Sequence, residues 1–144
     1  MSIEERKTMI RRLVEEAFSK GNLAIVDETL SLNYVLHTAD GNQLTGPEAW
    51  KQFILGRRNG FPDIRCAVED IACDGDILAL RTTLTGTNTG SFMGMPPTGK
   101  KASIQMGDFF RFEDDKPVEQ WQFVNQLALL QQLGVAPPAM RPSN

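Results

Sequence analysis

The chain has 144 residues, a length that fits one domain with a sizeable core. Hydrophobic residues make up 41% and charged residues 23%, a globular balance that excludes a disordered or fibrous chain. The net charge of −3 provides no basic field for nucleic acid or anionic lipid, and no apolar run is long enough to span a membrane.

The N-terminal residues predict two helices. Ser2 and Glu5 form a capping box, in which a hydroxyl and a carboxylate each bind a free amide of the first turn. Apolar side chains then recur at helical spacing until Gly21, which can adopt the left-handed conformation of a helix C-cap. Asn22 caps a second, short helix. This charged segment lacks the apolar core of a signal peptide, so we expect a cytoplasmic protein.

A short strand and a third helix come next. Residues 34–37 have the pattern of a brief strand. Pro47 then opens a helix, at a position where its missing amide costs nothing. Trp50, Phe53 and Ile54 form the inward face of this helix.

After residue 63 the pattern changes from helical spacing to alternation, which predicts strands. The first two are joined by a two-residue turn at Asp74-Gly75, a sequence that hairpins prefer. A short helix follows the last strand and ends at Gly134. The expected strands are residues 64–73, 76–90, about 101–112 and about 117–126, and the helix is residues 127–133.

Helices followed by long antiparallel strands are the α+β order. We expect a cone-shaped α+β barrel, in which a curved antiparallel sheet of about four long strands plus a short one wraps around three helices. A gap between the two layers would form one apolar ligand pocket. Residues 1–134 form this single domain, and residues 135–144 are a Pro-rich tail that we expect to be mobile.

The strands hold more apolar residues than we can assign to one buried face. These residues are Val68, Ile71, Leu80, Leu84, Ile104 and Met106. An exposed apolar sheet face is a typical subunit interface, so we expect a homodimer that forms through the sheet.

Residues that could bind a metal are few. Cys66 and Cys73 lie far from the single histidine, His37, so the chain lacks a standard zinc pattern. We expect both cysteines to be free thiols in a reducing cytoplasm, and no metal to be bound.

Several short motifs occur in a characteristic order. They are Tyr34-Val35-Leu36-His37, Thr45-Gly46-Pro47-Glu48, Phe61-Pro62-Asp63, residues 86–90, residues 94–100, Arg111-Phe112, Glu119-x-Trp121 and residues 131–134. In order and spacing they resemble the SnoaL-like polyketide cyclases, or ester cyclases, over nearly the whole chain. The resemblance implies the cone fold shared with nuclear transport factor 2 and ketosteroid isomerase. It also implies a pocket for a flat apolar carbonyl compound and no metal or organic cofactor.

Cyclases of this family are understood to close a ring by intramolecular aldol chemistry. A carboxylate removes the proton beside a carbonyl, and neighbouring donors hold the enolate oxygen. Such a base needs a pKa raised towards neutrality by apolar surroundings, and the donors must be in place before charge develops.

The sequence departs from the family at its acid–base positions. The essential carboxylate of the family follows the Glu-x-Trp element, where this chain has Gln122 and Asn125 as the two possible matches. Both are amides, which have no useful basicity at neutral pH. A family position that is commonly histidine is Asp108 here, and Asn88 replaces a second frequent histidine.

Asp108 and His37 are therefore our candidate catalytic residues. Asp108 would be the base if it faces the pocket rather than solvent, and His37 would polarise a carbonyl unless it is a hydrogen-bonded structural histidine. Candidate substrate-binding residues are Gln122, Asn125, Trp121, Phe123, Arg81 and Trp50. The alternatives for these residues are cross-strand hydrogen bonds for the amides, core packing for the aromatic side chains and an ion pair for Arg81.

Three functions are compatible with this pattern. The first is a cofactor-independent enzyme that binds a small apolar carbonyl compound and enolises it by acid–base chemistry. The second is a non-catalytic binding module with the same pocket, because a fold does not determine a function. The third is a hydroxylation-type relative, for which the replacement of the acid by an amide would fit.

Overall fold

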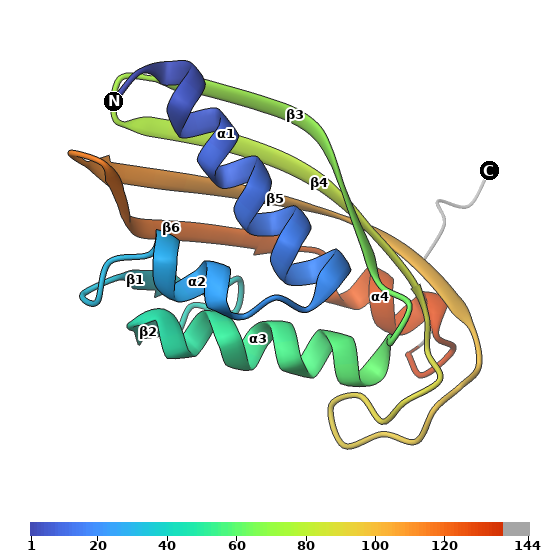
Figure 1. Ribbon diagram of the computed structural model, residues 1–144. Helices are drawn as coiled ribbons and strands as arrows, with labels where there is room; N and C mark the ends of the chain where they lie inside the picture. Colours follow the sequence, from blue (N-terminus) through green and yellow to red (C-terminus); the bar gives the residue numbers. More distant parts are fainter. Residues whose placement is uncertain (137–144) are drawn as a thin grey trace.

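The computed structural model describes residues 1–136, and its helices α1, α2 and α3 cover one face of a curved sheet (Figure 1). The helices are α1 (Ile3–Val14), α2 (Ala24–Thr29), α3 (Pro47–Gly60) and α4 (Gln126–Gln132), and a π-helical segment, Glu15–Ser19, extends α1. Ser2 and Glu5 form the capping box that starts α1, as expected. From residue 137 on, the expected tail lies outside the described residues.

Six strands form one open sheet. They are β1 (Val35–His37), β2 (Gln43–Thr45), β3 (Arg65–Asp74), β4 (Ile77–Thr87), β5 (Lys101–Glu113) and β6 (Lys116–Val124), in the order β2-β1-β6-β5-β4-β3. All neighbours are antiparallel except β1 and β6. The α+β class and the four long strands are confirmed. β2 was not predicted, because this edge strand of three exposed residues has no buried face to produce an alternating pattern.

The turn between β3 and β4 is displaced by one residue from its expected place. Asp74 pairs with Ile77, so the turn residues are Gly75 and Asp76 rather than Asp74 and Gly75. Gly75 has a φ of +61°, a conformation that glycine adopts without a steric penalty. The turn therefore lies where glycine occupies the position that requires a positive φ.

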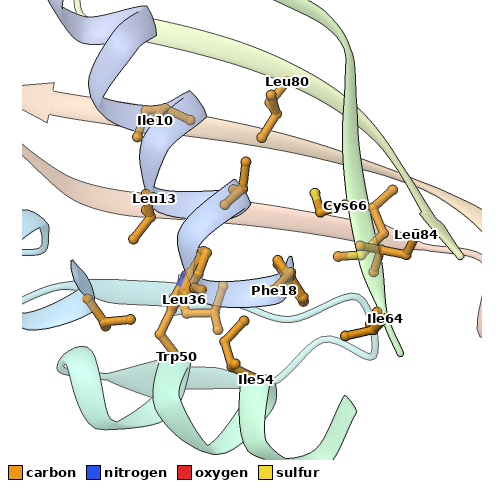
Figure 2. Close-up of a cluster of buried hydrophobic side chains, with 14 of the residues drawn as sticks. Ile10, Leu13, Phe18, Leu36, Trp50, Ile54, Ile64, Cys66, Leu80 and Leu84 are labelled. Atoms are coloured by element: carbon orange, nitrogen blue, oxygen red, sulfur yellow. The ribbon is translucent and has the colours of Figure 1, made fainter. Parts of the chain in front are cut away.

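The inner face of the sheet packs against α1 and α3 (Figure 2). Leu13 of α1 and Ile54 of α3 are fully buried, and Leu80 and Leu84 of β4 contribute from the sheet. The apolar cavity that remains between the layers, beside Ile64, has a volume of only about 20 Å³. A cavity of that size holds about one water molecule, so this cavity is too small to be the ligand pocket expected between the layers.

The apolar residues that suggested a surplus all belong to the core side of the sheet. Leu80, Leu84, Ile104 and Met106 are buried, and Val68 and Ile71 pack against the same cluster. The β3 bulge between Val68 and Asp70 shifts the alternation by one residue, which is why the sequence pattern looked inconsistent with one face. The exposed apolar residues of the outer face are instead Phe109 and Phe123.

Asn88 holds the loop between β4 and β5 in place. Its buried amide donates to the carbonyl oxygens of Gly60 and Gly90 at 3.1 and 3.0 Å. Its side-chain oxygen accepts from the backbone amide and the hydroxyl of Thr98, both at 2.9 Å. One side chain thus joins the end of α3 to both ends of the loop.

We expect Asn88→Ala to lower the free energy of unfolding by about 2–4 kcal/mol, since buried backbone groups would lose their partners. Urea unfolding followed by circular dichroism measures this loss. Asn33→Ala is the matched control, because Asn33 is exposed and its side chain makes no hydrogen bond within residues 1–136. Equal stability of the two variants would contradict the role of Asn88.

The remaining observations concern the cysteines, metal sites and membrane. Cys66 and Cys73 are free thiols. Within residues 1–136 no helix is long and apolar enough to cross a membrane, and no cluster of three or more histidine, cysteine or acidic side chains could hold a metal ion.

Candidate active site

Asp108 lies on the inner face of β5, away from solvent. Alternation along β5 places Met106, Asp108 and Phe110 on the buried side and Phe109 on the exposed side. Asp108 is only 5% exposed. Its neighbours across the sheet are Leu80 on β4 and Gln122 on β6. The alternation expected for Asp108 and Phe109 is confirmed.

Burial raises the pKa of Asp108 to about 7, although a hydrogen bond from Gln120 works in the opposite direction. Desolvation dominates because the apolar neighbours stabilise an ionised carboxylate poorly. With a pKa of about 7, the protonated and ionised forms of the carboxyl group are both populated near neutral pH. This is the property that a general base and acid requires.

Three side chains fix the orientation of the carboxyl group. The hydroxyl of Tyr34 and the indole Nε1–H of Trp50 both donate to Oε1 of Gln120, the latter at 2.6 Å. Because two donors occupy the amide oxygen, Nε2 of Gln120 points the other way and donates to Oδ1 of Asp108 at 2.7 Å. All four side chains are buried, so this chain of hydrogen bonds is shielded from water.

Gln122 connects this buried group to an open hollow. The hollow has a volume of about 390 Å³, within the range of small-molecule sites. It lies between the β1–β2 hairpin, α3, β6 and the start of α4, and Gln122 and Phe53 contribute to its wall. Asp108 is not among the lining residues. Its neighbour across the β5–β6 ladder, Gln122, is the one that reaches the hollow.

His37 lies on the other face of the sheet and is not brought together with Asp108. Its Nε2 is 2.7 Å from Oε2 of Glu119, and its ring stacks on Trp121 with centroids 5.2 Å apart. Nε of Arg111 donates to the other oxygen of Glu119 at 3.0 Å. These residues form a partly exposed cluster on the outer face. This location is the one expected if His37 is a hydrogen-bonded structural histidine.

The other predicted binding residues are divided between the two faces. Phe123 and Arg81 lie on the outer face, where Nε of Arg81 pairs with Asp70 at 2.7 Å. Asn125 caps α4 by accepting from the amide of Ala128 at 3.0 Å. Asp108, Gln122 and Trp50 are the members of the predicted set that share the inner side. A role in binding or catalysis remains a prediction for each of them.

Known proteins resemble this chain in both sequence and fold. A sequence model of the family described as SnoaL-like polyketide cyclase matches residues 8–133. The chain belongs to this family. The resemblance found from the sequence motifs is therefore confirmed.

Individual relatives of this SnoaL-like chain agree with that assignment. It is 28% identical over 130 residues to aklanonic acid methyl ester cyclase DnrD of Streptomyces peucetius, covering 88% of each chain. The structure of AclR, a proposed hydroxylase from Streptomyces galilaeus, matches with a TM-score of 0.85 and 31% identity over 97% of this chain and 87% of AclR. A proposed SnoaL-like polyketide cyclase from Jannaschia sp. CCS1 matches with a TM-score of 0.84 and 25% identity over 94% of this chain and 95% of that protein. The expected nuclear transport factor 2-like fold is confirmed.

Sequence reasoning missed three residues around the site: Gln120, Tyr34 and Arg57. Gln120 stands two residues from Gln122, so alternation alone places it on the same face of β6. Arg57 stands three residues after Ile54 and seven after Trp50, the spacing of one helix face, which makes it a charge on an apolar face. Tyr34 gives no comparable signal, because it precedes β1 and its contact with Gln120 spans 86 residues.

Proposed function

We propose that this SnoaL-like chain is a cofactor-independent acid–base enzyme that enolises a small, apolar, polyketide-like carbonyl compound and promotes aldol ring closure. The observation that carries the proposal is the buried carboxyl of Asp108. Its pKa of about 7 and its hydrogen bond from Gln120 give it the properties of a positioned base. The proposal is tested by comparing the turnover of a carbonyl substrate by Asp108→Asn with that of the wild type.

The proposed reaction needs no redox step. Asp108 removes a proton from the carbon beside a carbonyl, and the electron pair of the C–H bond forms an enolate. The enolate carbon attacks a second carbonyl of the same molecule, which closes the ring and produces an alkoxide. The proton held by Asp108 then returns to that alkoxide, so the carboxylate is regenerated and no atom is gained or lost.

Gln122 would hold the developing enolate oxygen. Its amide is buried, reaches the hollow and neighbours Asp108 across the ladder. An amide N–H donor stabilises an enolate without competing for the proton. In this proposal the substrate enters the hollow and approaches Asp108 beside Gln122, whose amide donates to the enolate oxygen.

Hydroxylation is a second candidate function, supported by the similarity to AclR. Product analysis separates the two functions, since ring closure conserves the mass of the substrate whereas hydroxylation adds one oxygen atom. A non-catalytic binding module would bind the carbonyl compound and return it unchanged. An incubation supplied with O2 and a two-electron reductant, which a hydroxylation would consume, therefore distinguishes all three functions.

We also propose a homodimer through the outer face of the sheet. Phe109 and Phe123 are 45% and 56% exposed and pack edge to face with centroids 6.3 Å apart. Exposed aromatic pairs of this kind are typical of the centre of a subunit interface. The cytoplasm remains our proposed compartment, which the two free cysteines support.

Sedimentation at micromolar concentration is expected to give a species of twice the 16.0 kDa chain mass. The double substitution Phe109→Ser and Phe123→Ser should convert it to a monomer, because it removes the aromatic pair. Leu32→Ser is a control, since Leu32 is exposed and lies outside the sheet. A wild-type monomer would exclude this interface.

A further inference from the structure

Arg57 is a buried charge on the inner side of α3. Its side chain belongs to the helix face that carries Trp50 and Ile54, and the residue is only 7% exposed. Burial lowers its pKa to about 10, so the guanidinium is still charged at neutral pH. Burying a charge is unfavourable unless a partner compensates for it.

The partners of Arg57 within residues 1–136 are neutral. One N–H group donates to Oε1 of Gln126 at 3.1 Å, and the guanidinium lies 4.9 and 5.2 Å from the ring centroids of Phe53 and Phe92. No carboxylate of the described residues forms an ion pair with it, whereas Arg81 and Arg111 on the outer face both have acidic partners. A guanidinium has five N–H donors, so most of the hydrogen-bonding capacity of Arg57 is unused by neighbouring side chains.

Arg57 also occupies the boundary between two spaces. It lines both the apolar cavity of about 20 Å³ and the hollow of about 390 Å³ that Gln122 reaches. The one carboxylate on the wall of the hollow, Asp40, is bound within its own hairpin by Thr38 and Asn42. Arg57 therefore has unused N–H donors beside a hollow that is large enough for a small ligand.

We infer that Arg57 binds a carboxylate of the ligand, and that this site prefers a planar aromatic keto acid to the corresponding ester. The guanidinium would make two parallel hydrogen bonds to the carboxylate, a geometry that its planar fork favours. Phe53 and Phe92 restrict the guanidinium by stacking against it, which reduces the ordering that binding requires. The inference rests on the proposed function and narrows it, because the substrate would be an otherwise apolar carbonyl compound whose single carboxylate lies in the hollow that leads to Asp108.

Anthraquinone-2-carboxylate and its methyl ester are suitable probes, because they differ only in charge and one methyl group. Binding is measured by quenching of tryptophan fluorescence at neutral pH. The wild-type protein should bind the acid about 10- to 100-fold more tightly than the ester, as expected for a hydrogen-bonded charge. In Arg57→Gln this preference should vanish through weaker binding of the acid, while the affinity for the ester stays within about threefold.

Two further variants complete the test. Arg57→Lys keeps the charge but loses the fork, so it should retain a reduced preference for the acid, and it serves if Arg57→Gln fails to fold. Arg11→Gln removes an exposed charge from α1 and should bind both probes as the wild type does. The inference is overturned if the wild type shows no preference, if neither probe binds, or if Arg57→Gln keeps the preference.

These outcomes are separable from failure of the proposed function. Absence of an acid preference in the wild type, alongside normal dependence of turnover on Asp108, would refute the inference about Arg57 and leave the enzyme proposal in place. An Arg57-dependent preference with turnover that is independent of Asp108 would have the opposite meaning. It would support the carboxylate site and refute Asp108 as the base.

Discussion

Asp108→Asn is expected to lower the turnover of a carbonyl substrate by about 10²–10⁴-fold, the usual contribution of a positioned general base. The substitution preserves size and shape, and the new side-chain oxygen can still accept the hydrogen bond that Gln120 donates. It removes only the group that takes the proton. Affinity for the substrate should therefore change little, and the loss should appear in kcat, which steady-state kinetics measures directly.

The pH dependence gives an independent check on the same residue. Because the pKa of Asp108 is raised to about 7, the base is half ionised near neutrality, and kcat/KM of the wild type should rise with pH through about 7. Asp70→Asn is the matched control, since Asp70 is an exposed carboxylate of the outer face, paired with Arg81. If Asp108→Asn turned the substrate over at the wild-type rate, Asp108 would not be the base and a binding module would be favoured.

The second large effect concerns stability rather than rate. Asp108→Asn should raise the free energy of unfolding at pH 8 by roughly 2–4 kcal/mol over the wild type, because an ionised carboxylate no longer has to be buried. At pH 4 the two proteins should have nearly equal stability. Urea unfolding at a series of pH values measures the difference, and groups common to both proteins cancel in it.

The number of protons that Asp108 binds in the folded and unfolded states explains why the stability difference grows with pH. In the unfolded chain an aspartate releases its proton near pH 3.9, whereas the folded protein retains this proton until about pH 7. Between these values the folded state binds more protons, so raising the pH favours unfolding of the wild type but not of the variant. A difference in stability that stayed constant from pH 4 to pH 8 would show that Asp108 has an ordinary pKa.

The loss of turnover and the gain in the free energy of unfolding expected for Asp108→Asn have the same physical cause. The surroundings that raise the pKa of Asp108, namely the apolar neighbours Leu80 and Phe110 together with burial, also destabilise the folded protein above neutrality. A variant that is both more stable and less active is the pattern expected when a strained or poorly solvated group is kept for function. A structural role for Asp108 would instead predict loss of stability at every pH.

The sequence by itself determined the order of the elements, the fold class and the family. Capping at Ser2, alternation along β5 and the ordered motifs are local patterns, and local patterns can be followed without knowing which elements meet in space. The same alternation placed Asp108 and Phe109 on opposite faces of the sheet, as the structure shows. It did not give the face of His37, because a strand of three residues is too short for a pattern to reveal its buried side.

The tertiary structure decided which side chains share the site. Parallel pairing of β1 with β6 puts His37 beside Trp121 on the outer face and brings Tyr34 close to Gln120 on the inner one. The bulge in β3 gathers the apparent surplus of apolar residues into the core. Contacts between residues about 70 to 90 positions apart depend on strand order and register, which no local pattern encodes. For the same reason the position of Arg57, between the apolar cavity and the hollow, is seen only in the folded chain. Among the described residues Arg57 has no acidic partner there.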